Sequence, residues 1–288
     1  MKLIRSIEEA HEYCKKLKQD GKTIATINSG GDLHEGHMSL VKIAKDNADI
    51  VIMMVDHPIE FVGKKDRFKK FSKNYEDNIL NNDITLCERN KVDIFFSPSM
   101  WDMYEDVVTK VNLVNPYTKS LEELPESHRN LLVSPYHMLS YIKDFNILMT
   151  DITMLGQKDI YQTMSVISMI KDFNLNIKPI IVPIARDEDG LPSSSSNRSL
   201  TEGQRKRAVY LCKKLQEVTK WSSYKSIKEI KNYLLKAIEN SRSDVSCVNI
   251  YDFKTGKNID MIVDDMIIIV IGVFGDLHYI DNVMVKPK

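Results

Sequence analysis

The sequence predicts an α/β fold, in which a parallel-sheet domain is followed by a smaller α+β domain. Apolar, β-branched runs alternate with helical patterns through the first 184 residues, which is the order that a parallel sheet requires. Residues 50–55 are apolar almost without interruption, as expected of a strand that is buried on both faces. A polar, serine-rich segment at residues 187–197 then separates this part from a region with a different order of elements.

The first domain, residues 1–184, is expected to alternate helices with strands. Ser6 and Glu9 form a capping-box pattern ahead of apolar residues at helical spacing, and Gly21 is placed to end that helix. Short β-branched runs closed by turn-forming residues predict the strands. The expected helices are residues 6–17, 35–44 and 158–171, and the expected strands are residues 23–27, 50–55, 92–96, 152–155 and 177–184. Residues 60–83 are expected to be exposed and helical only toward their end, and residues 112–130 irregular.

The second domain, residues 185–288, is expected to be smaller and to close over the site. Its polar segment at residues 187–197 contains a glycine, a proline and four consecutive serines, which is typical of a loop or an interdomain hinge. Helical patterns at residues 201–220 and 226–241 precede strand-like runs at residues 245–253, 266–274 and 278–285. About 100 residues are sufficient for an independent α+β domain.

The composition is that of a protein of the cytoplasm. The 40 Lys and Arg residues balance the 40 Asp and Glu residues, which argues against a nucleic acid or an anionic membrane as the main partner. The longest apolar run, Met266–Phe274, is too short to cross a bilayer, and the acidic N-terminal residues do not form a signal peptide. The four cysteines are far apart and unpaired in sequence, which indicates reduced thiols and no zinc site.

The strongest local signal is the tetrapeptide His34-Glu35-Gly36-His37, which lies between a predicted strand and a predicted helix. Unpaired N–H groups and the positive end of the dipole make a helix N-terminus suitable for phosphate. Two histidines at this point could bind the same phosphate oxygens and stabilise developing charge. Nearby glycines would allow a nucleotide to approach the backbone. The alternative is that both histidines are ordinary loop residues.

Two further segments carry groups that suit phosphate. Gly156-Gln157-Lys158-Asp159 follows an apolar run and precedes a helix, and sites in open α/β sheets lie at the carboxyl ends of strands. Lys158 could neutralise a phosphate there, although capping and solvation are the common roles of such residues. Residues 193–198 bring hydroxyl groups and a guanidinium together in one loop that could clamp a triphosphate. Taken alone, that loop is equally typical of a flexible linker.

These three segments occur in the same order and spacing as in the pantothenate synthetase (pantoate–β-alanine ligase) family, which the chain resembles over nearly its whole length. This family belongs to the nucleotidyltransferase-like group with a Rossmann-like parallel-sheet domain and an HxGH motif. Asp32–His37 resembles the family's first ATP motif, His57–Phe61 its NPxQF segment, and Leu155–Asp159 with Gln162 its FGEKDxxQ motif. Further similar segments are residues 91–99 with Tyr104, residues 182–197, and Tyr279–Asn282, which resembles an RLIDN closure.

The resemblance implies an ATP-dependent, AMP-forming carboxylate–amine ligase of pantothenate and coenzyme A biosynthesis. The carboxylate of pantoate would attack the α-phosphate of Mg-ATP to give pantoyl adenylate and pyrophosphate, and the amine of β-alanine would then displace AMP. His34 and His37 would bind the ATP phosphates, with His37 as the acid, and Lys158 would stabilise the α-phosphate in transfer.

The resemblance also implies binding residues, cofactors and partners. The implied ATP-binding residues are Gly30, Gly31, Asp32, Leu33, His34, Gly36, His37, Gly156, Lys158, Asp159, Ala185, Ser194, Ser195 and Ser196. The implied substrate-binding residues are Gln162, Glu60 and His57. ATP and Mg²⁺ would be the cofactors. A homodimer is implied, with no nucleic-acid or membrane partner.

The chain departs from the family at several of these positions. Asn28-Ser29-Gly30-Gly31 stands where the family has PTMG, and Ser196 stands where it has the arginine of SSRN, which Arg198 or Arg186 could partly replace. The family's RPGHFRG segment, expected near residues 129–136, has only a faint counterpart in His128-Arg129.

The departures around the acid leave the substrate open. Glu60 and His57 replace a glutamine and an asparagine of the family's segment. An ionised glutamate would repel the carboxylate to which a glutamine amide can donate. Three hypotheses therefore follow: a pantothenate synthetase, a related ligase for a different acid or amine, or a catalytically weak nucleotide-binding homologue.

Overall fold

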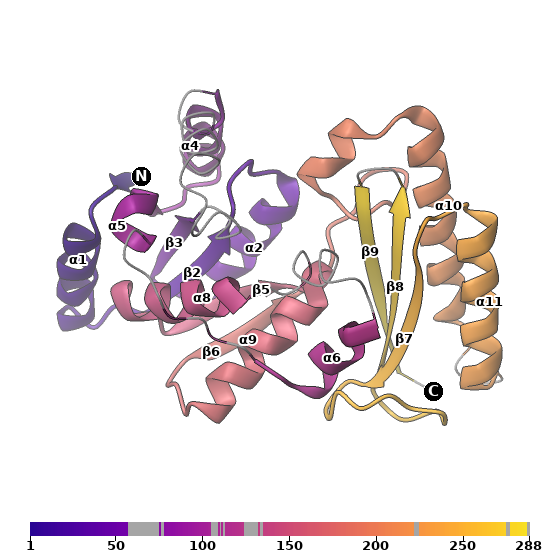
Figure 1. Cartoon of the computed structure of the whole chain (residues 1–288). Coiled ribbons are helices and arrows are strands. Elements are labelled where there is room, and N and C mark those ends of the chain that lie inside the picture. The colour runs from indigo at the N-terminus through magenta and orange to yellow at the C-terminus, as the bar shows by residue number, and fades with distance from the viewer. Residues whose placement is uncertain are drawn as a thin grey trace. The chain divides into compact units, whose positions relative to one another are not determined.

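The computed structural model describes residues 1–56, 75, 78–104, 109, 111, 113–123, 132, 135–221, 225–274 and 277–286. The chain forms two compact units (Figure 1). The first contains Met1–Leu113, Asn130–Gly156 and Gln162–Pro183, and the second contains Val114–Arg129, Gln157–Tyr161 and Ile184–Lys288. Compared with a division at residue 184, the second unit thus also takes in two short earlier segments.

The first unit is built on a six-stranded parallel sheet, as predicted. In the order β1-β4-β3-β2-β5-β6, its strands are β1 (Lys2–Ile4), β4 (Ile94–Phe96), β3 (Ile50–Val55), β2 (Ile24–Ser29), β5 (Ile152–Gly156) and β6 (Lys178–Val182). The sequence analysis did not predict β1, because three residues at a sheet edge carry too little periodicity to be recognised.

Helices cover both faces of this sheet, because neighbouring strand residues point to opposite sides. Met53 packs on one side with α2 (Glu35–Lys45) and α4 (Leu80–Arg89). Met54 packs on the other side with α1 (Ile7–Gln19) and α5 (Met100–Tyr104). Helices α8 (Pro135–Ile147) and α9 (Ile160–Asp172) share a further core cluster with Leu155 of β5.

The sequence analysis missed α8 for a physical reason. Its residues Ser140 and Asp144 lie one turn apart and are buried. Two polar side chains on the buried face interrupt the apolar stripe by which an amphipathic helix is recognised. The polar side chains themselves are explained below.

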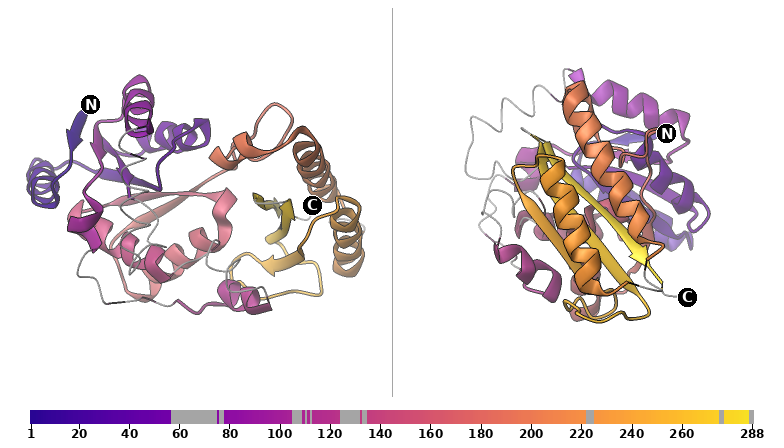
Figure 2. Two further views of the ribbon diagram at one scale, coloured as in Figure 1. Left: turned by 45° about the horizontal axis from the view of Figure 1, so that its top comes forward. Right: turned by 90° about the vertical axis from the view of Figure 1, so that its right-hand side faces the viewer.

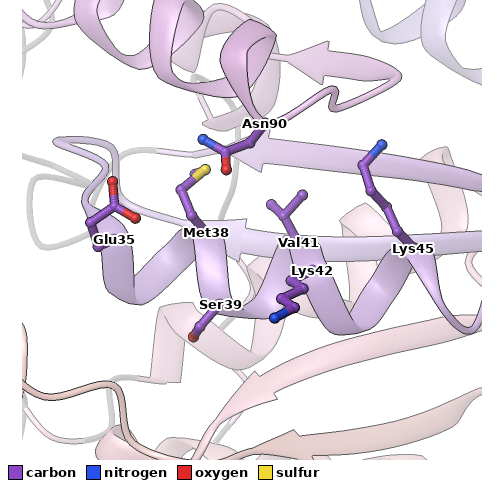
Figure 3. Close-up of a pocket in the computed structure, with 7 residues that line it drawn as sticks. All are labelled: Glu35, Met38, Ser39, Val41, Lys42, Lys45 and Asn90. Atoms are coloured by element: carbon purple, nitrogen blue, oxygen red, sulfur yellow. The ribbon is translucent and has the colours of Figure 1, made fainter.

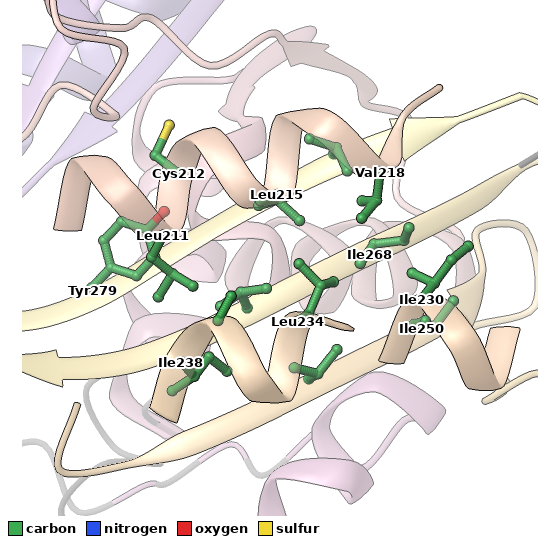
Figure 4. Packing of buried hydrophobic residues seen from close by; sticks show 14 of the residues in the cluster. Leu211, Cys212, Leu215, Val218, Ile230, Leu234, Ile238, Ile250, Ile268 and Tyr279 are labelled. Atoms are coloured by element: carbon green, nitrogen blue, oxygen red, sulfur yellow. The ribbon is translucent and has the colours of Figure 1, made fainter. Parts of the chain in front are cut away.

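The second unit is an α+β arrangement, again as predicted. Strands β7 (Ser246–Asp252), β8 (Met266–Phe274) and β9 (Leu277–Val285) form an antiparallel sheet. Helices α10 (Glu202–Val218) and α11 (Ile227–Asn240) lie across one face of it (Figure 2, right). Leu215, Leu234 and Ile268 belong to the core between them (Figure 4). Short helices α6 (Pro116–Lys119), η2 (Ser120–Glu123), η3 (Gln157–Asp159) and η4 (Ser195–Ser199) complete the unit.

Strand β2 marks the point at which the chain order reverses in the parallel sheet. It pairs with β3 on one side and with β5 on the other, and Ile27 lies opposite both Met53 and Met154. Ligands of open α/β sheets bind outside the carboxyl ends of the strands at such a point. The residues after β2 and after β5 are therefore placed where a ligand is expected. No helix within the described part of the chain is long and apolar enough to cross a membrane.

Candidate active site

The two histidines of the HxGH segment form the N-terminal cap of α2. His34 is the N-cap residue in an extended conformation, and its Nδ1 accepts a hydrogen bond from the Gly36 N–H at 3.1 Å. The Nδ1 atom of His37 accepts in turn from the His34 N–H at 3.2 Å. An imidazole nitrogen that accepts a backbone N–H carries no proton, so each neutral ring has its proton on Nε2. The cap therefore selects one tautomer for both histidines.

Ser29, the last residue of β2, holds the second ring. The Nε2 atom of His37 lies 3.0 Å from Ser29 Oγ, which also accepts the Gly31 N–H at 3.2 Å. The two histidine rings are 4.2 Å apart between centroids and half-buried. The helix N-terminus thus carries ring N–H groups of the kind that phosphate oxygens accept, and that of His37 is directed at Ser29 Oγ. Ser29 was not predicted as a site residue, since a serine at the end of a strand is ordinary turn chemistry.

The loop between β2 and α2 is held by hydrogen bonds within the protein. Gly31 and Asp32 both have left-handed backbone conformations, with φ of 83° and 55°. The N–H groups of Asp32 and Leu33 donate to the carboxylate of Asp83, and the side chain of Leu33 is buried in the core. These two N–H groups are therefore occupied within the protein.

A buried polar cluster lies at the carboxyl ends of the neighbouring strands. Asn28 of β2 donates to Asp144 of α8, and Asp56, directly after β3, accepts from Tyr104. Ser140 contacts both carboxyl groups. Burial, followed by the negative charge of Asp56, raises the pKa of Asp144 well above its usual range. No sequence motif indicated this cluster, because its members come from four separate elements.

Lys158 and Asp159 are held in the short turn that follows β5. Lys158 Nζ lies 3.2 Å from Asp159 Oδ1, and the two side chains are 28% and 53% exposed. The turn is fastened by Asn282 of β9, which exchanges hydrogen bonds of 2.9 Å with the side chain and the carbonyl of Gln157. Lys158 is thus presented to solvent from a fixed backbone.

Lys158 lines a small cleft of about 20 Å³. The hydroxyl-bearing residues Ser194 and Ser196 line it, with their Oγ atoms 2.8 Å apart, and His278 of β9 lines it as well. Ser195, which was predicted beside them, is not among the lining residues. The cleft therefore brings together Lys158 and two of the three predicted serines. His278 was missed, because only the pairing of β8 with β9 places it there.

The serine loop is braced rather than free. Arg205 of α10 donates to Asp187 and Asp189 at 2.9 and 2.7 Å, and Asp187 accepts from Ser193 and Asn197. Burial alone would raise the pKa of Asp187, but the hydrogen bonds from Ser193, Arg205 and Asn197 outweigh it and lower that pKa. The loop is thus an ordered element instead of the flexible linker that its composition allowed.

Arg186 does not replace the family's missing arginine. Its guanidinium donates two hydrogen bonds of 2.9 Å to Asp281, which is fully buried, and a third to the Gly190 carbonyl. A bidentate pair of this kind has a fixed geometry. Arg186 therefore stabilises the second unit. Ala185 contributes through its backbone, since its carbonyl accepts the Ser193 N–H at 2.9 Å.

Of the predicted acid-binding residues, Gln162 lies in the part of the chain that the structure describes. Gln162 lies half-buried in the first turns of α9, close in sequence to Gly156, whose carbonyl accepts from Thr163. Glu60, His57, His128 and Arg129 lie outside the described residues. No group of three or more His, Cys, Asp or Glu side chains suited to a metal ion occurs among the residues that are described.

A larger groove of about 370 Å³ runs along α2 (Figure 3). Val41, Lys42, Lys45 and Asn90 are among its lining residues, and neither histidine is. Lys42 and Lys45 point in different directions, and Lys45 donates to the Lys91 carbonyl. The groove therefore lacks convergent polar groups of the kind that define a binding site.

Comparison with known proteins agrees with this geometry. The family model described as pantoate-beta-alanine ligase matches residues 2–284. Pantothenate synthetase of Caldicellulosiruptor bescii is 32% identical over an alignment of 299 residues, which covers 100% of both chains. That of Acetivibrio thermocellus is 31% identical over 292 residues, covering 99% of this chain and 100% of the relative.

Solved structures show the same fold. Pantothenate synthetase from Thermus thermophilus superposes with a TM-score of 0.81 at 23% identity, and all of both chains is covered. Pantoate-beta-alanine ligase from Francisella tularensis, complexed with beta-gamma ATP and beta-alanine, has a TM-score of 0.71 at 24% identity, with coverage of 99% and 97%. The expected fold class is confirmed by both.

Proposed function

Because the chain belongs to the pantoate–β-alanine ligase family, we propose that it activates pantoate with ATP as an acyl-adenylate and joins it to β-alanine. Ligases of this family form an amide bond, so the chain is an enzyme of the carbon–nitrogen ligase class. The family match across residues 2–284 favours this reaction over a different acid, a different amine or a weak nucleotide-binding homologue. The observation that supports the proposal is the pair of histidines that cap the N-terminus of α2, with the proton of each neutral ring on Nε2.

In the first step, the pantoate carboxylate attacks the α-phosphorus of ATP and pyrophosphate leaves. Negative charge accumulates on the phosphate oxygens, and donors fixed before the reaction lower its cost. His34 supplies such a donor at the helix N-terminus. The Nε2–H of His37 faces Ser29 Oγ and would be shared with a phosphate oxygen, and a second proton on its Nδ1 would face the His34 N–H. We therefore assign His37 hydrogen-bond donation rather than the role of an acid that gives up a proton.

The groups around Lys158 would act on the same triphosphate. The lysine offsets charge on the transferring phosphoryl group, and the Ser194 and Ser196 hydroxyls bind the oxygens of the leaving pyrophosphate. Because Ser196 replaces an arginine, the cleft contains one permanent cation, Lys158, together with the titratable His278. The exposed carboxylate of Asp159 is an oxygen donor of the kind that hydrated Mg²⁺ accepts. Mg²⁺ bound to the phosphates would neutralise part of their charge.

In the second step, the amine of β-alanine attacks the carbonyl carbon of the adenylate and AMP leaves. Gln162 is proposed to hold pantoate through its amide, together with Glu60 and His57. The unit that contains residues 185–288 is proposed to close over the nucleotide. We further propose that the protein is a cytoplasmic homodimer.

The test is ATP–pyrophosphate exchange that depends on pantoate. Exchange should require ATP, Mg²⁺ and pantoate but not β-alanine, because only the first step is needed. Addition of β-alanine should then give AMP and pantothenate in equal amounts. Exchange with other small hydroxy acids or amino acids, but none with pantoate, would reject the proposed substrate. Absence of exchange with every acid would reject the activity.

A further inference from the structure

The loop that precedes the HxGH segment has an unfavourable backbone shape. Asp32 has φ of 55°, in the left-handed region that residues other than glycine, Asn and Asp rarely adopt. Gly31 has φ of 83°. Gly31 adopts this conformation without strain, whereas the left-handed backbone of Asp32 carries a cost that surrounding contacts offset. The loop connects Ser29, which contacts His37, with His34, which caps α2.

One buried carboxyl group holds this loop from the side. Asp83 of α4 is 2% exposed, and its Oδ1 accepts the Leu33 N–H at 2.7 Å. Its Oδ2 accepts the Asp32 N–H and the Tyr75 hydroxyl, both at 2.9 Å. Three donors converge on two oxygens, and all three bonds need acceptors. An aspartate fits this arrangement, whereas an asparagine amide would turn a donor toward at least one of them.

Tyr75 completes the arrangement on the other side of the loop. A Cβ atom built on Gly31 would lie 2.5 Å from a ring carbon of Tyr75, so the ring packs directly against the glycine backbone. The ring is 1% exposed and leaves no room for the loop to relax. Asp83 and Tyr75 thus hold the backbone of residues 31–33 by hydrogen bonds and by contact.

We propose that Asp83 is a positioning residue, which with Tyr75 fixes the loop so that His34 and His37 meet the phosphates in register. This inference rests on the proposed function, since it assigns a role to the support of the same site. Leu33 is adjacent to His34, and displacement of its N–H would move the residue whose own N–H holds the His37 ring. Asp83 does not need to touch ATP to act in this way.

The test compares Asp83→Asn with two variants. The Asp83→Asn enzyme should lose about 10-fold or more in kcat, with a much smaller change in the KM for ATP, because misplaced groups weaken the transition state. Asp151→Asn is the matched control, since Asp151 also accepts a backbone N–H, that of Ile24 at 2.8 Å, but at the opposite end of β2. It should lower the thermal midpoint and leave kcat unchanged. Tyr75→Phe removes one donor and should give a smaller loss in kcat. This variant provides the test if Asp83→Asn does not fold.

A double-mutant cycle separates positioning from general destabilisation. If Asp83 acts through the histidines, Asp83→Asn should cost less than about threefold in an enzyme that already carries His37→Ala. An equal loss in both backgrounds would overturn the inference, and so would wild-type kcat in folded Asp83→Asn and Tyr75→Phe enzymes. An unimpaired His37→Ala enzyme would instead reject the histidine role itself, and with it the inference that depends on that role.

Discussion

At the scale of single residues, the backbone decides which nitrogen of each histidine is available. His34 and His37 both use Nδ1 to accept backbone N–H groups, so each neutral ring has its proton on Nε2, and in His37 this Nε2–H faces Ser29 Oγ. This explains why the motif needs two residues between the histidines: that spacing allows reciprocal capping of the same helix turn. The same bonds that start α2 therefore orient the groups proposed to bind ATP.

We expect His37→Ala to reduce pantoate-dependent ATP–pyrophosphate exchange by about 100-fold or more, the range found when a positioned group is removed from a reacting centre. The matched control is His11→Ala, because His11 lies on α1 with its Nδ1 beside the Ile147 carbonyl. Exchange rates should be compared at equal fractions of folded protein. Unchanged exchange in the His37 variant would remove the histidine from the site.

Lys158 provides a second prediction at this scale. If the lysine offsets charge that develops only during transfer, Lys158→Ala should lower kcat by about 100-fold while raising the KM for ATP far less. Lys171→Ala, which alters an exposed lysine at the end of α9, is the control. A rise in KM with unchanged kcat would make Lys158 a ground-state binding residue.

At the scale of elements, the polar residues of α8 explain how the helix docks. Ser140 and Asp144 would be unfavourable in a buried interface if they lacked partners, but Asn28 of β2 donates to Asp144 and Asp56, directly after β3, accepts from Ser140. This contact costs free energy, because it holds the Asp144 carboxyl group in surroundings that disfavour its charged form.

This burial predicts a pH dependence of stability. The raised pKa of Asp144 means that, as the pH rises above about 4, the unfolded chain releases this proton while the folded chain retains it. The free energy of unfolding should therefore fall with rising pH until the folded group also ionises. Asp144→Asn keeps an acceptor for Asn28 and Ser140 but cannot ionise, so it should remove part of that fall. Urea unfolding of both proteins between about pH 4 and pH 7 measures it, and parallel curves would contradict the prediction.

At the scale of the whole molecule, the two sets of groups that we propose to bind phosphate belong to different units. His34 and His37 belong to the first unit, whereas Lys158, Ser194 and Ser196 belong to the second. If both sets act on one triphosphate, as we propose, nucleotide binding must favour a conformation in which the units act together.

Small-angle X-ray scattering can measure this effect. ATP with a non-reactive analogue of pantoate should reduce the radius of gyration, and AMP alone should reduce it less, because AMP lacks the phosphates that the second unit is proposed to bind. The forward scattering of the free enzyme should correspond to twice the mass of one chain if the protein is a homodimer. An unchanged radius with saturating ligands would contradict closure.

Much of the fold could be predicted because local physics specifies it. Three elements are predicted by local patterns alone, without reference to the rest of the chain. These patterns are the apolar run of β3, the capping pattern before α1 and the helical spacing of α11. The segment that contains His34 could be recognised from its place between a strand and a helix, whereas those with Lys158 and Ser194 gained their meaning from the family resemblance. Residues whose partners are close in sequence carry their own signal.

The tertiary structure decided everything that depends on partners distant in sequence. The Asp83 carboxylate accepts from N–H groups 50 and 51 residues earlier in the chain, and Arg186 pairs with an aspartate 95 residues later. No window of sequence contains both members of such a pair, so neither the support of the histidine loop nor the structural role of Arg186 could be predicted. By itself, the sequence determined the fold class and most of the order of elements, and it indicated the groups that we propose to bind phosphate. Packing determined which tautomers, ion pairs and buried carboxyl groups surround them, because hydrogen bonds and desolvation depend on neighbours that only the folded chain supplies.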